Sequence, residues 1–289
     1  MQLKNRCAVV TGASQGLGFE VARQFVKEGA RVMLCARNAN KLFDAQKELQ
    51  LLAEHPSKVS AQVTDISRAE EVDHLFATAI KEFGYLDVLV ANAGVYGTKG
   101  PVEEVNWEEW SNAIDINLKG TVLQCRAILP HFKKRRCGKI IIMSGGGATK
   151  PMPYFSAYAA SKAAVVRFAE TLAEEVVSFG IDVNTVAPGA LNTRLLDEVL
   201  EAGPEKVGKN YYEQSLKQKS DGGVPLSKGA SLCVFLASSV SDGVTGKLIS
   251  AVWDPWKTFS QYIDELTHSD IYTLRRIIPK DRGKAWGDL

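Results

Sequence analysis

The sequence predicts an α/β fold, a doubly wound parallel sheet of about seven strands with helices on both faces. Short apolar runs alternate along the chain with amphipathic segments of helical length, which is typical of parallel strands joined by crossover helices. The chain has 289 residues, of which 45% are hydrophobic, enough to bury the core of one α/β domain. We expect a single domain over residues 1–252 and a C-terminal extension over residues 253–289.

The first strand is expected at residues 7–11, and a glycine-rich turn, residues 12–18, follows it directly. Beyond the turn, apolar residues repeat at helical spacing until Gly29. Glycines let a backbone approach a phosphate closely, and a helix N-terminus supplies free N–H groups and a positive dipole. Ordinary loops also contain such glycines, but this position between strand and helix favours a Rossmann-type dinucleotide site.

The second strand, residues 30–37, ends where such a fold meets the adenosine ribose. An acidic side chain at this point would accept hydrogen bonds from the two ribose hydroxyls and repel a phosphate. Here Ala36 is followed by Arg37, whose guanidinium can bind a 2′-phosphate through two hydrogen bonds. A surface Arg in a turn is the alternative. The sequence therefore favours NADP(H) over NAD(H).

The remaining elements continue the alternation. Asn106 is expected to cap the long helix that follows it, with Glu109 three residues further on. Residues 192–223 form a polar stretch to which we assign no element. The expected strands are residues 58–64, 86–91, 139–143, 182–187 and 247–252, and the expected helices are residues 68–83, 107–135, 156–179 and 227–239.

Tyr158 and Lys162 are four residues apart, so a helix places both on one face. A free phenol has a pKa of about 10, and a nearby cation stabilises the phenolate. At ~4 Å and an effective dielectric constant of ~20 the attraction is roughly 4 kcal/mol, an upper bound before desolvation is subtracted. The pair predicts a tyrosine that exchanges protons near neutral pH. An unrelated Tyr and Lys would have the same spacing, so the accompanying motifs decide.

Several motifs accompany this pair in a fixed order: Thr11-Gly-x-x-x-Gly-x-Gly18, Asn92-Ala-Gly94, Asn117, Ser144, Tyr158-x-x-x-Lys162 and Pro188-Gly189. With them, residues 5 to 250 or so resemble the compact branch of the short-chain dehydrogenase/reductase family. The resemblance implies hydride transfer between a nicotinamide cofactor and a small carbonyl or alcohol substrate, with a ketone and a secondary alcohol as the expected pair.

The resemblance also implies a cofactor site. Asp65 would contact the adenine amino group, and Pro188, Gly189 and Thr193 would hold the nicotinamide carboxamide. The full expected set is Gly12, Ser14, Gln15, Gly16, Leu17, Gly18, Arg37, Asp65, Ile66, Asn92, Ala93, Gly94, Tyr158, Lys162, Pro188, Gly189 and Thr193.

Four residues are expected to be catalytic by the same resemblance. Tyr158 would protonate the carbonyl oxygen, and Ser144 would orient it. Lys162 would bind the nicotinamide ribose and lower the pKa of Tyr158, and Asn117 would hold a water for proton resupply. One departure concerns the serine: many family members carry it thirteen residues before the tyrosine, where this chain has Gly145. The glycines that follow Ser144 can absorb the one-residue difference.

Composition limits other functions. A net charge of +2 gives no field that would gather nucleic acid or an anionic membrane. The five cysteines show no Cys-x-x-Cys spacing and are expected to be reduced core thiols. No metal site is expected. The first strand begins close to Met1, and no apolar run reaches the ~20 residues of a membrane span. We expect a cytoplasmic homodimer or homotetramer, paired through the helices at residues 107–135 and 156–179.

The extension mixes aromatic and aliphatic residues with charges, which suggests packing rather than disorder. We expect it against the active-site side of its own or a neighbouring subunit. Two other functions compete with an oxidoreductase. A sugar-nucleotide epimerase or dehydratase would show the extended glycine pattern and a sizeable C-terminal domain. A dinucleotide-binding sensor without turnover would not need Ser144, Tyr158 and Lys162 together.

Overall fold

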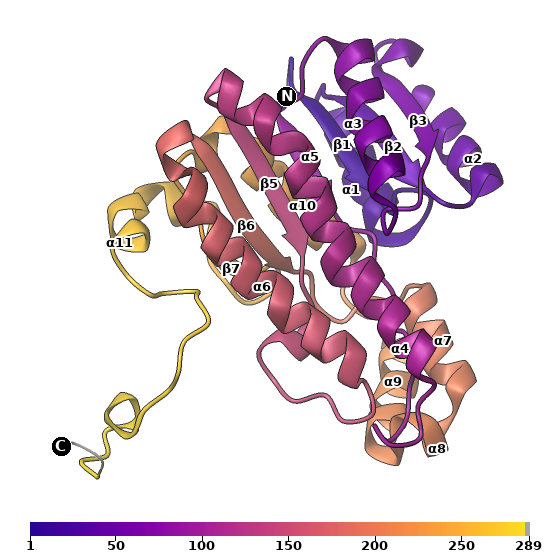
Figure 1. Cartoon of the computed structure of the whole chain (residues 1–289), viewed down its shortest axis with the longest axis vertical. Coiled ribbons are helices and arrows are strands. Elements are labelled where there is room, and N and C mark those ends of the chain that lie inside the picture. Colours follow the sequence, from indigo (N-terminus) through magenta and orange to yellow (C-terminus); the bar gives the residue numbers. More distant parts are fainter. Residues whose placement is uncertain (287–289) are drawn as a thin grey trace.

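The computed structural model describes residues 1–286, and within them seven parallel strands form one sheet (Figure 1). Their order is β3-β2-β1-β4-β5-β6-β7, so the sheet grows outward in both directions from β1 and β4. This confirms the predicted doubly wound Rossmann-type fold. The strands are β1 (Cys7–Thr11), β2 (Arg31–Ala36), β3 (Val59–Val63), β4 (Val88–Ala91), β5 (Gly138–Met143), β6 (Ile181–Ala187) and β7 (Leu248–Ser250).

Helices cover both faces because the inner strands are buried on both sides. One core layer packs α1, α2 and α10 against the sheet, and the other packs α3, α5 and α6. The helices are α1 (Gly16–Lys27), α2 (Ala39–Gln50), α3 (Ala69–Phe83), α4 (Trp107–Ile114), α5 (Gly120–Arg135), α6 (Ser156–Val176), α7 (Arg194–Ala202), α8 (Pro204–Val207), α9 (Lys209–Asp221), α10 (Leu226–Ala237) and α11 (Ile263–Thr267).

The helix predicted at residues 107–135 is interrupted. It begins as expected, with the Asn106 side chain accepting a hydrogen bond from the Glu109 amide at 2.9 Å. A π-helical turn, Asp115–Lys119, then separates α4 from α5. The Thr121 hydroxyl, in the first turn of α5, donates to the Asn117 carbonyl at 2.8 Å. The π-helical turn matters for the site because it carries Asn117.

Five helices lie where the sequence prediction assigned none: α2, α7, α8, α9 and α11. The helix α2 buries a narrow stripe of three residues, Leu42, Ala45 and Leu49. The polar stretch at residues 192–223 contains α7, α8 and α9, which lie beyond the C-terminal ends of the strands (Figure 1). Of these, α9 buries only Ser215, so its sequence resembles a loop.

The start of the predicted extension is part of the core. Trp256, Phe259 and Leu266 are buried, and the Trp256 ring lies 5.5 Å from that of Phe235 on α10. Further along, the Tyr272 carbonyl accepts a hydrogen bond from the Leu248 amide of β7 at 2.7 Å. Residues 287–289 of the extension lie outside the described residues.

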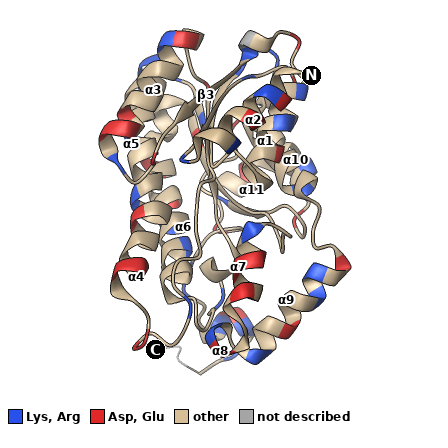
Figure 2. Cartoon of the chain, turned by 90° about the vertical axis from the view of Figure 1, so that its right-hand side faces the viewer, with Lys and Arg blue, Asp and Glu red and all other residues tan. Residues whose placement is uncertain are grey.

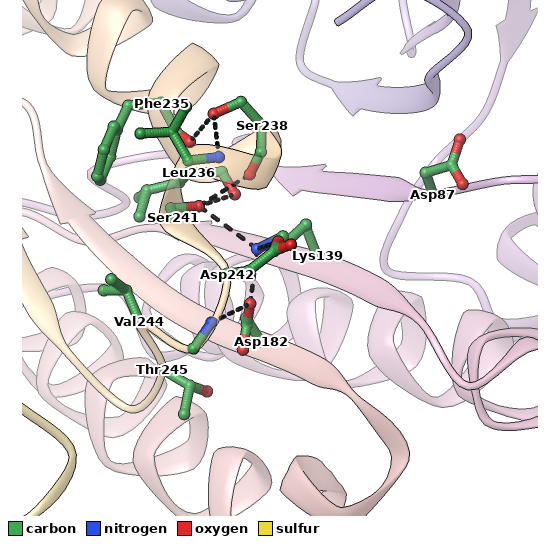
Figure 3. A network of polar contacts seen from close by, with 12 residues as sticks. Asp87, Lys139, Asp182, Phe235, Leu236, Ser238, Ser241, Asp242, Val244 and Thr245 are labelled. Carbon is green, nitrogen blue, oxygen red and sulfur yellow. Dashed lines mark hydrogen bonds and ion pairs between the residues drawn. The ribbon is translucent and has the colours of Figure 1, made fainter. Parts of the chain in front are cut away.

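A network of charged and polar side chains joins the N-terminal ends of β5 and β6, at the edge of the sheet opposite the glycine turn (Figure 3). The buried Lys139 ammonium lies 2.6 Å from the Asp182 carboxylate and 2.7 Å from that of Asp242. It also donates to the Ser241 hydroxyl at 3.4 Å. The network joins β5 and β6 to the loop that leads into β7.

Two further features bear on the expectations from composition. All five cysteines are free thiols, and four of them are buried, while Cys137 is partly exposed. Among the described helices, none combines the length and the apolar character that crossing a membrane requires.

Candidate active site

A cleft of about 2040 Å³ lies at the C-terminal ends of the strands, as expected for this fold. Its lining includes every residue predicted for the cofactor site and three of the four predicted catalytic residues, Ser144, Tyr158 and Lys162. Asn117, the fourth, is buried behind the wall of the cleft. Residues far apart in the sequence thus meet at one place.

The glycine turn is packed so closely that side chains would not fit. Gly12 has a φ of +65°, and a Cβ on it would lie 2.9 Å from both Asn92 Nδ2 and Ala93 Cα. A Cβ on Gly18 would overlap the Gly12 carbonyl oxygen. The Asn92 side chain donates to the Thr11 carbonyl at 2.8 Å. The Asn92-Ala-Gly94 segment therefore holds the turn in place.

The start of α1 fits a phosphate group. The helix begins at Gly16, which lines the cleft, and its N-cap residue is Gln15. Among residues 1–286, no side chain accepts a hydrogen bond from the first N–H groups of the helix. Free N–H groups and the positive end of the helix dipole would face a pyrophosphate here. These residues therefore fit the dinucleotide that the sequence predicts, which would supply or accept the hydride.

The adenosine end of the cleft carries positive charge. Arg37 lines it just beyond β2, and Lys41 lines it from α2 with its ammonium 3.4 Å from the Gln15 side chain. Burial alone would raise the pKa of the Asp65 carboxyl, but two hydrogen bonds from Ser67 and the charge of Arg37 bring that pKa below its usual value. Asp65 is thus an anion beside Arg37.

Tyr158 and Lys162 lie on the same face of α6, both buried at the cleft wall. The Lys162 ammonium lies 5.8 Å from the centre of the Tyr158 ring and donates to the Met143 carbonyl at 2.7 Å. Burial lowers the pKa of the Lys162 ammonium to about 8. The predicted shared face is therefore present, and the lysine is held at the end of β5.

The direction of the Tyr158 pKa differs from the prediction. Burial, followed by the neighbouring Tyr211 phenol, raises the pKa of Tyr158 above its ordinary value. The expected lowering by Lys162 is wrong for this state of the protein, because desolvation disfavours the phenolate and the ammonium is directed at the Met143 carbonyl. Tyr158 is a protonated phenol here, which is the form that a proton donor needs.

The serine region explains the departure from the family spacing. A Cβ on Gly145 would overlap the Tyr158 hydroxyl, so a serine at this position is incompatible with the observed placement of the phenol. Ser144 lines the cleft at the end of β5, and its hydroxyl is buried without a hydrogen-bond partner among the described residues. An unpaired buried hydroxyl is free to bond a substrate oxygen.

Asn117 supports the site from behind. Its side chain accepts from the Val95 amide at 2.9 Å and donates to the Val95 carbonyl at 2.9 Å and the Ser161 hydroxyl at 3.0 Å. A Cβ on Gly94 would lie 3.1 Å from Asn117 Oδ1 and 3.6 Å from Lys162 Nζ. Asn117 and Lys162 therefore flank the same glycine, and Asn117 fixes the loop beside the lysine.

An aromatic group beside Tyr158 was missed at the sequence level. The Tyr96 ring meets the Tyr158 ring edge-on at 4.6 Å, and the Phe155 ring lies 5.2 Å from Tyr96 and 5.0 Å from Tyr211. Tyr96 and Tyr211 both line the cleft. Tyr96 lies two residues after Gly94, a position that could have indicated a role. Tyr211 comes from α9, whose fold the polar sequence concealed.

The comparisons with known proteins agree with this geometry. The family model for short chain dehydrogenase matches residues 6–203. A 3beta-hydroxysteroid dehydrogenase 1 from Eggerthella lenta is 40% identical over 204 residues, which cover 70% of this chain and 77% of that protein. A glucose 1-dehydrogenase from Gluconobacter oxydans is 39% identical over 244 residues, covering 83% and 88%.

Solved structures of other proteins are also similar to this chain. An actinorhodin polyketide ketoreductase with NADPH superimposes with a TM-score of 0.77 at 28% identity, over 86% of this chain and 96% of that one. An NAD⁺-bound xylitol dehydrogenase shares the fold with a TM-score of 0.79 at 23% identity, over 86% and 98%. A glycine turn at the start of α1, a buried Tyr and Lys on α6 and a family match over residues 6–203 converge on one assignment. This chain belongs to the short-chain dehydrogenases and is an NAD(P)-dependent oxidoreductase.

Proposed function

We propose that the protein uses NADP(H) to interconvert a ketone or aldehyde and an alcohol, with Tyr158 as general acid and base. The observation that carries the proposal is the buried pair of Tyr158 and Lys162 in the same cleft as the uncapped start of α1. A proton donor and a nucleotide site that share one cleft can serve a single hydride transfer. Asn117, Ser144, Tyr158 and Lys162 form the proposed catalytic group.

Each side chain has a distinct task in the reduction direction. When bound, the nicotinamide supplies the hydride. Tyr158 donates its phenolic proton to the substrate oxygen as negative charge develops there, and the free Ser144 hydroxyl donates a second hydrogen bond to the same oxygen. Lys162 would leave the Met143 carbonyl for the nicotinamide ribose, and its charge would then stabilise the Tyr158 phenolate.

The preference for NADP(H) rests on Arg37. Arg37 follows the end of β2, and both Arg37 and Lys41 line the cleft; two cations on this wall would suit a 2′-phosphate. The Asp65 carboxylate is turned toward Ser67, whose amide and hydroxyl donate to it at 3.0 and 2.7 Å. The carboxylate keeps its negative charge, and Arg37 and Lys41 would have to outweigh it for a 2′-phosphate to bind.

The test begins with a screen of small ketones, aldehydes and polyols as substrates. The absorbance of the nicotinamide measures their turnover. Tyr158→Phe should lower kcat on the order of 10²–10⁴-fold while NADPH binding, measured by fluorescence, is retained. A Tyr158→Phe protein with unchanged kcat would refute the assignment of the proton donor. NADPH binding without turnover of any substrate would instead indicate a sensor.

A second experiment tests the cofactor. Arg37→Ala should raise the KM for NADPH on the order of 10-fold and leave the KM for NADH nearly unchanged, because only NADPH carries the 2′-phosphate. Arg68→Ala is the matched control, since Arg68 is an exposed arginine outside the cleft lining. Equal losses for both cofactors would count against recognition of the 2′-phosphate by Arg37.

We also propose the domain division predicted above, with residues 1–252 as the catalytic domain and residues 253–289 as an extension. The burial of Trp256 and Phe259 against the core supports packing of that extension on its own domain. Among residues 253–286, Trp253 and Asp254 line the cleft. We further propose that the protein acts as a homodimer or homotetramer.

A further inference from the structure

The end of the described chain leaves the body of the protein as an arm, residues 275–286 (Figure 1). The segment just before the arm is anchored: the Leu274 amide donates to the Glu170 carboxylate of α6 at 2.6 Å, and its carbonyl accepts from Arg167. The Tyr272 ring lies 5.3 Å from that of Phe259. The point at which the arm leaves the body is therefore fixed.

The arm has internal order of its own. Arg275 pairs with Asp270 at 2.6 Å and with Asp281 at 2.7 Å, and the Asp281 carboxylate also accepts from the Ile278 amide at 2.8 Å. In the described structure, the polar contacts of residues 275–286 stay within residues 270–284. The arm is held in shape without touching the domain through polar groups.

The side chains of the arm face solvent. Ile277 is 58% exposed and Trp286 is 73% exposed. The arm also carries five Lys or Arg residues and one Asp. A basic segment that presents two large apolar side chains to water has the composition of a contact surface.

A surface of opposite charge lies at the start of α4. This acidic patch, residues 102–109, contains four Glu residues and no Lys or Arg, and its carboxylates make no ion pair in the part of the chain that the structure describes. At its centre Trp107 is 70% exposed, stacked on Trp110 at 5.2 Å, and Val102 is 67% exposed. In Figure 2 the ribbon at α4 carries red segments, which mark Asp and Glu.

We propose that the arm of one subunit docks on the acidic patch of a second copy of this chain. The five cations would face the four glutamates, and Trp286 would cover the exposed face of Trp107. Charge complementarity selects the partner, and burial of the two indoles supplies contact area at low cost in side-chain entropy.

The arrangement within one chain favours a second copy over the arm's own domain. In Figure 1 the arm extends on one side of α6, whereas α4 lies on the other side. Each subunit carries both an arm and a patch, so two copies can exchange arms reciprocally. If a two-fold axis relates the two copies, this reciprocal exchange gives a closed dimer.

Paired charge reversals test the proposal in the full-length protein by sedimentation equilibrium. Arg276→Glu with Lys284→Glu brings the net charge of the arm from +4 to zero, and Glu104→Lys with Glu108→Lys brings that of the patch from −4 to zero. Each variant alone should raise the dissociation constant of the dimer at least about 10-fold in about 50 mM salt, with a smaller effect in about 500 mM salt. A 1:1 mixture of the two variants should recover part of the association, because the mixed dimer keeps one unaltered contact between an arm of charge +4 and a patch of charge −4.

A matched control, Lys47→Glu with Lys81→Glu, reverses two exposed lysines on α2 and α3 and should leave the dissociation constant unchanged. Far-ultraviolet circular dichroism and thermal unfolding establish that all variants fold. A monomeric wild-type protein, an oligomer unaffected by both reversals, or a mixture that fails to reassociate would each overturn the proposal. If the arm instead folded back on its own domain, both charge variants would leave the oligomer unaffected.

Discussion

Gly145 lies so close to Tyr158 that a Cβ on Gly145 would overlap the phenolic oxygen of Tyr158. The backbone of Gly145 is extended, with a φ of −176°, so any residue could adopt its conformation. The glycine is thus required by the position of the phenol and not by its own backbone. This relationship supports our proposal that Ser144, one residue earlier, supplies the orienting hydroxyl.

Gly145→Ala should lower kcat on the order of 10²-fold, because the added methyl group displaces the Tyr158 hydroxyl from the substrate oxygen and a misplaced catalytic group costs about this much. Steady-state kinetics with saturating NADPH measure the loss. Gly146→Ala is the matched control, since a Cβ there meets no atom within 4 Å among the described residues. Wild-type kcat in Gly145→Ala would show that Tyr158 tolerates the methyl group.

The sequence predicted the sheet and most of the cleft because both depend on local signals. Apolar runs indicate parallel strands, and residues that follow strand ends meet at one edge of the sheet. The helix α2 escaped prediction because its buried stripe is only three residues wide. The helix α7 repeats apolar residues at helical spacing, Leu195, Leu196, Val199 and Leu200, a signal that was overlooked. The helix α8 is a single turn, and α9, which carries Tyr211, buries only Ser215 and so resembles a loop.

Long-range contacts explain the errors at the site. Sequence spacing placed Lys162 beside Tyr158 correctly, but the Met143 carbonyl that binds the ammonium lies nineteen residues away on β5. The phenol packs against Tyr96 and is influenced by Tyr211, residues far from it in the sequence, which no local pattern reports. The predicted direction of the Tyr158 pKa was therefore wrong although the pair itself is present. The cytoplasmic location stays a prediction.

Lys162 should make the enzyme less stable than a variant without this charge. In the folded protein its pKa is about 8, below the ordinary lysine value of 10.5, so the folded chain disfavours the ammonium. Burial of the charged Lys162 lowers the free energy of unfolding. This destabilisation is fully present below pH 8 and disappears as the pH rises to about 10.5. Lys162→Met should therefore unfold with a free energy about 2 kcal/mol higher at pH 7, after allowance for the unpaired Met143 carbonyl.

Urea unfolding of the nucleotide-free protein at pH 7 and about pH 10 measures this difference, which should shrink at the higher pH. Lys162→Met should at the same time be inactive. Lys81→Met, a change at an exposed lysine, serves as the control and should show little effect at either pH. A Lys162→Met variant that is destabilised at pH 7 would mean that the hydrogen bond to Met143 outweighs desolvation.

Lys139 should be needed for stability. Its side chain is only 6% exposed and neutralises Asp182, which is itself mostly buried (Figure 3). Lys139→Met leaves that carboxylate without its partner and should lower the free energy of unfolding by about 3 kcal/mol. The double variant with Asp182→Asn should recover part of the loss, because the buried charge is then gone. Urea unfolding of both proteins measures the two free energies. An equal or larger loss of unfolding free energy in the double variant would contradict the explanation by an unpaired buried charge.

Two tryptophans three residues apart test whether the extension belongs to the core. Trp256 is 8% exposed and packs on Phe235, whereas Trp253 is 84% exposed. Trp256→Ala should lower the free energy of unfolding by about 3–5 kcal/mol, because the removed indole leaves a cavity beside α10. Trp253→Ala, the matched control, should change it by less than about 0.5 kcal/mol. If both variants unfolded with the wild-type free energy, the extension would not contribute to the core, and the boundary at residue 252 would separate an independent segment.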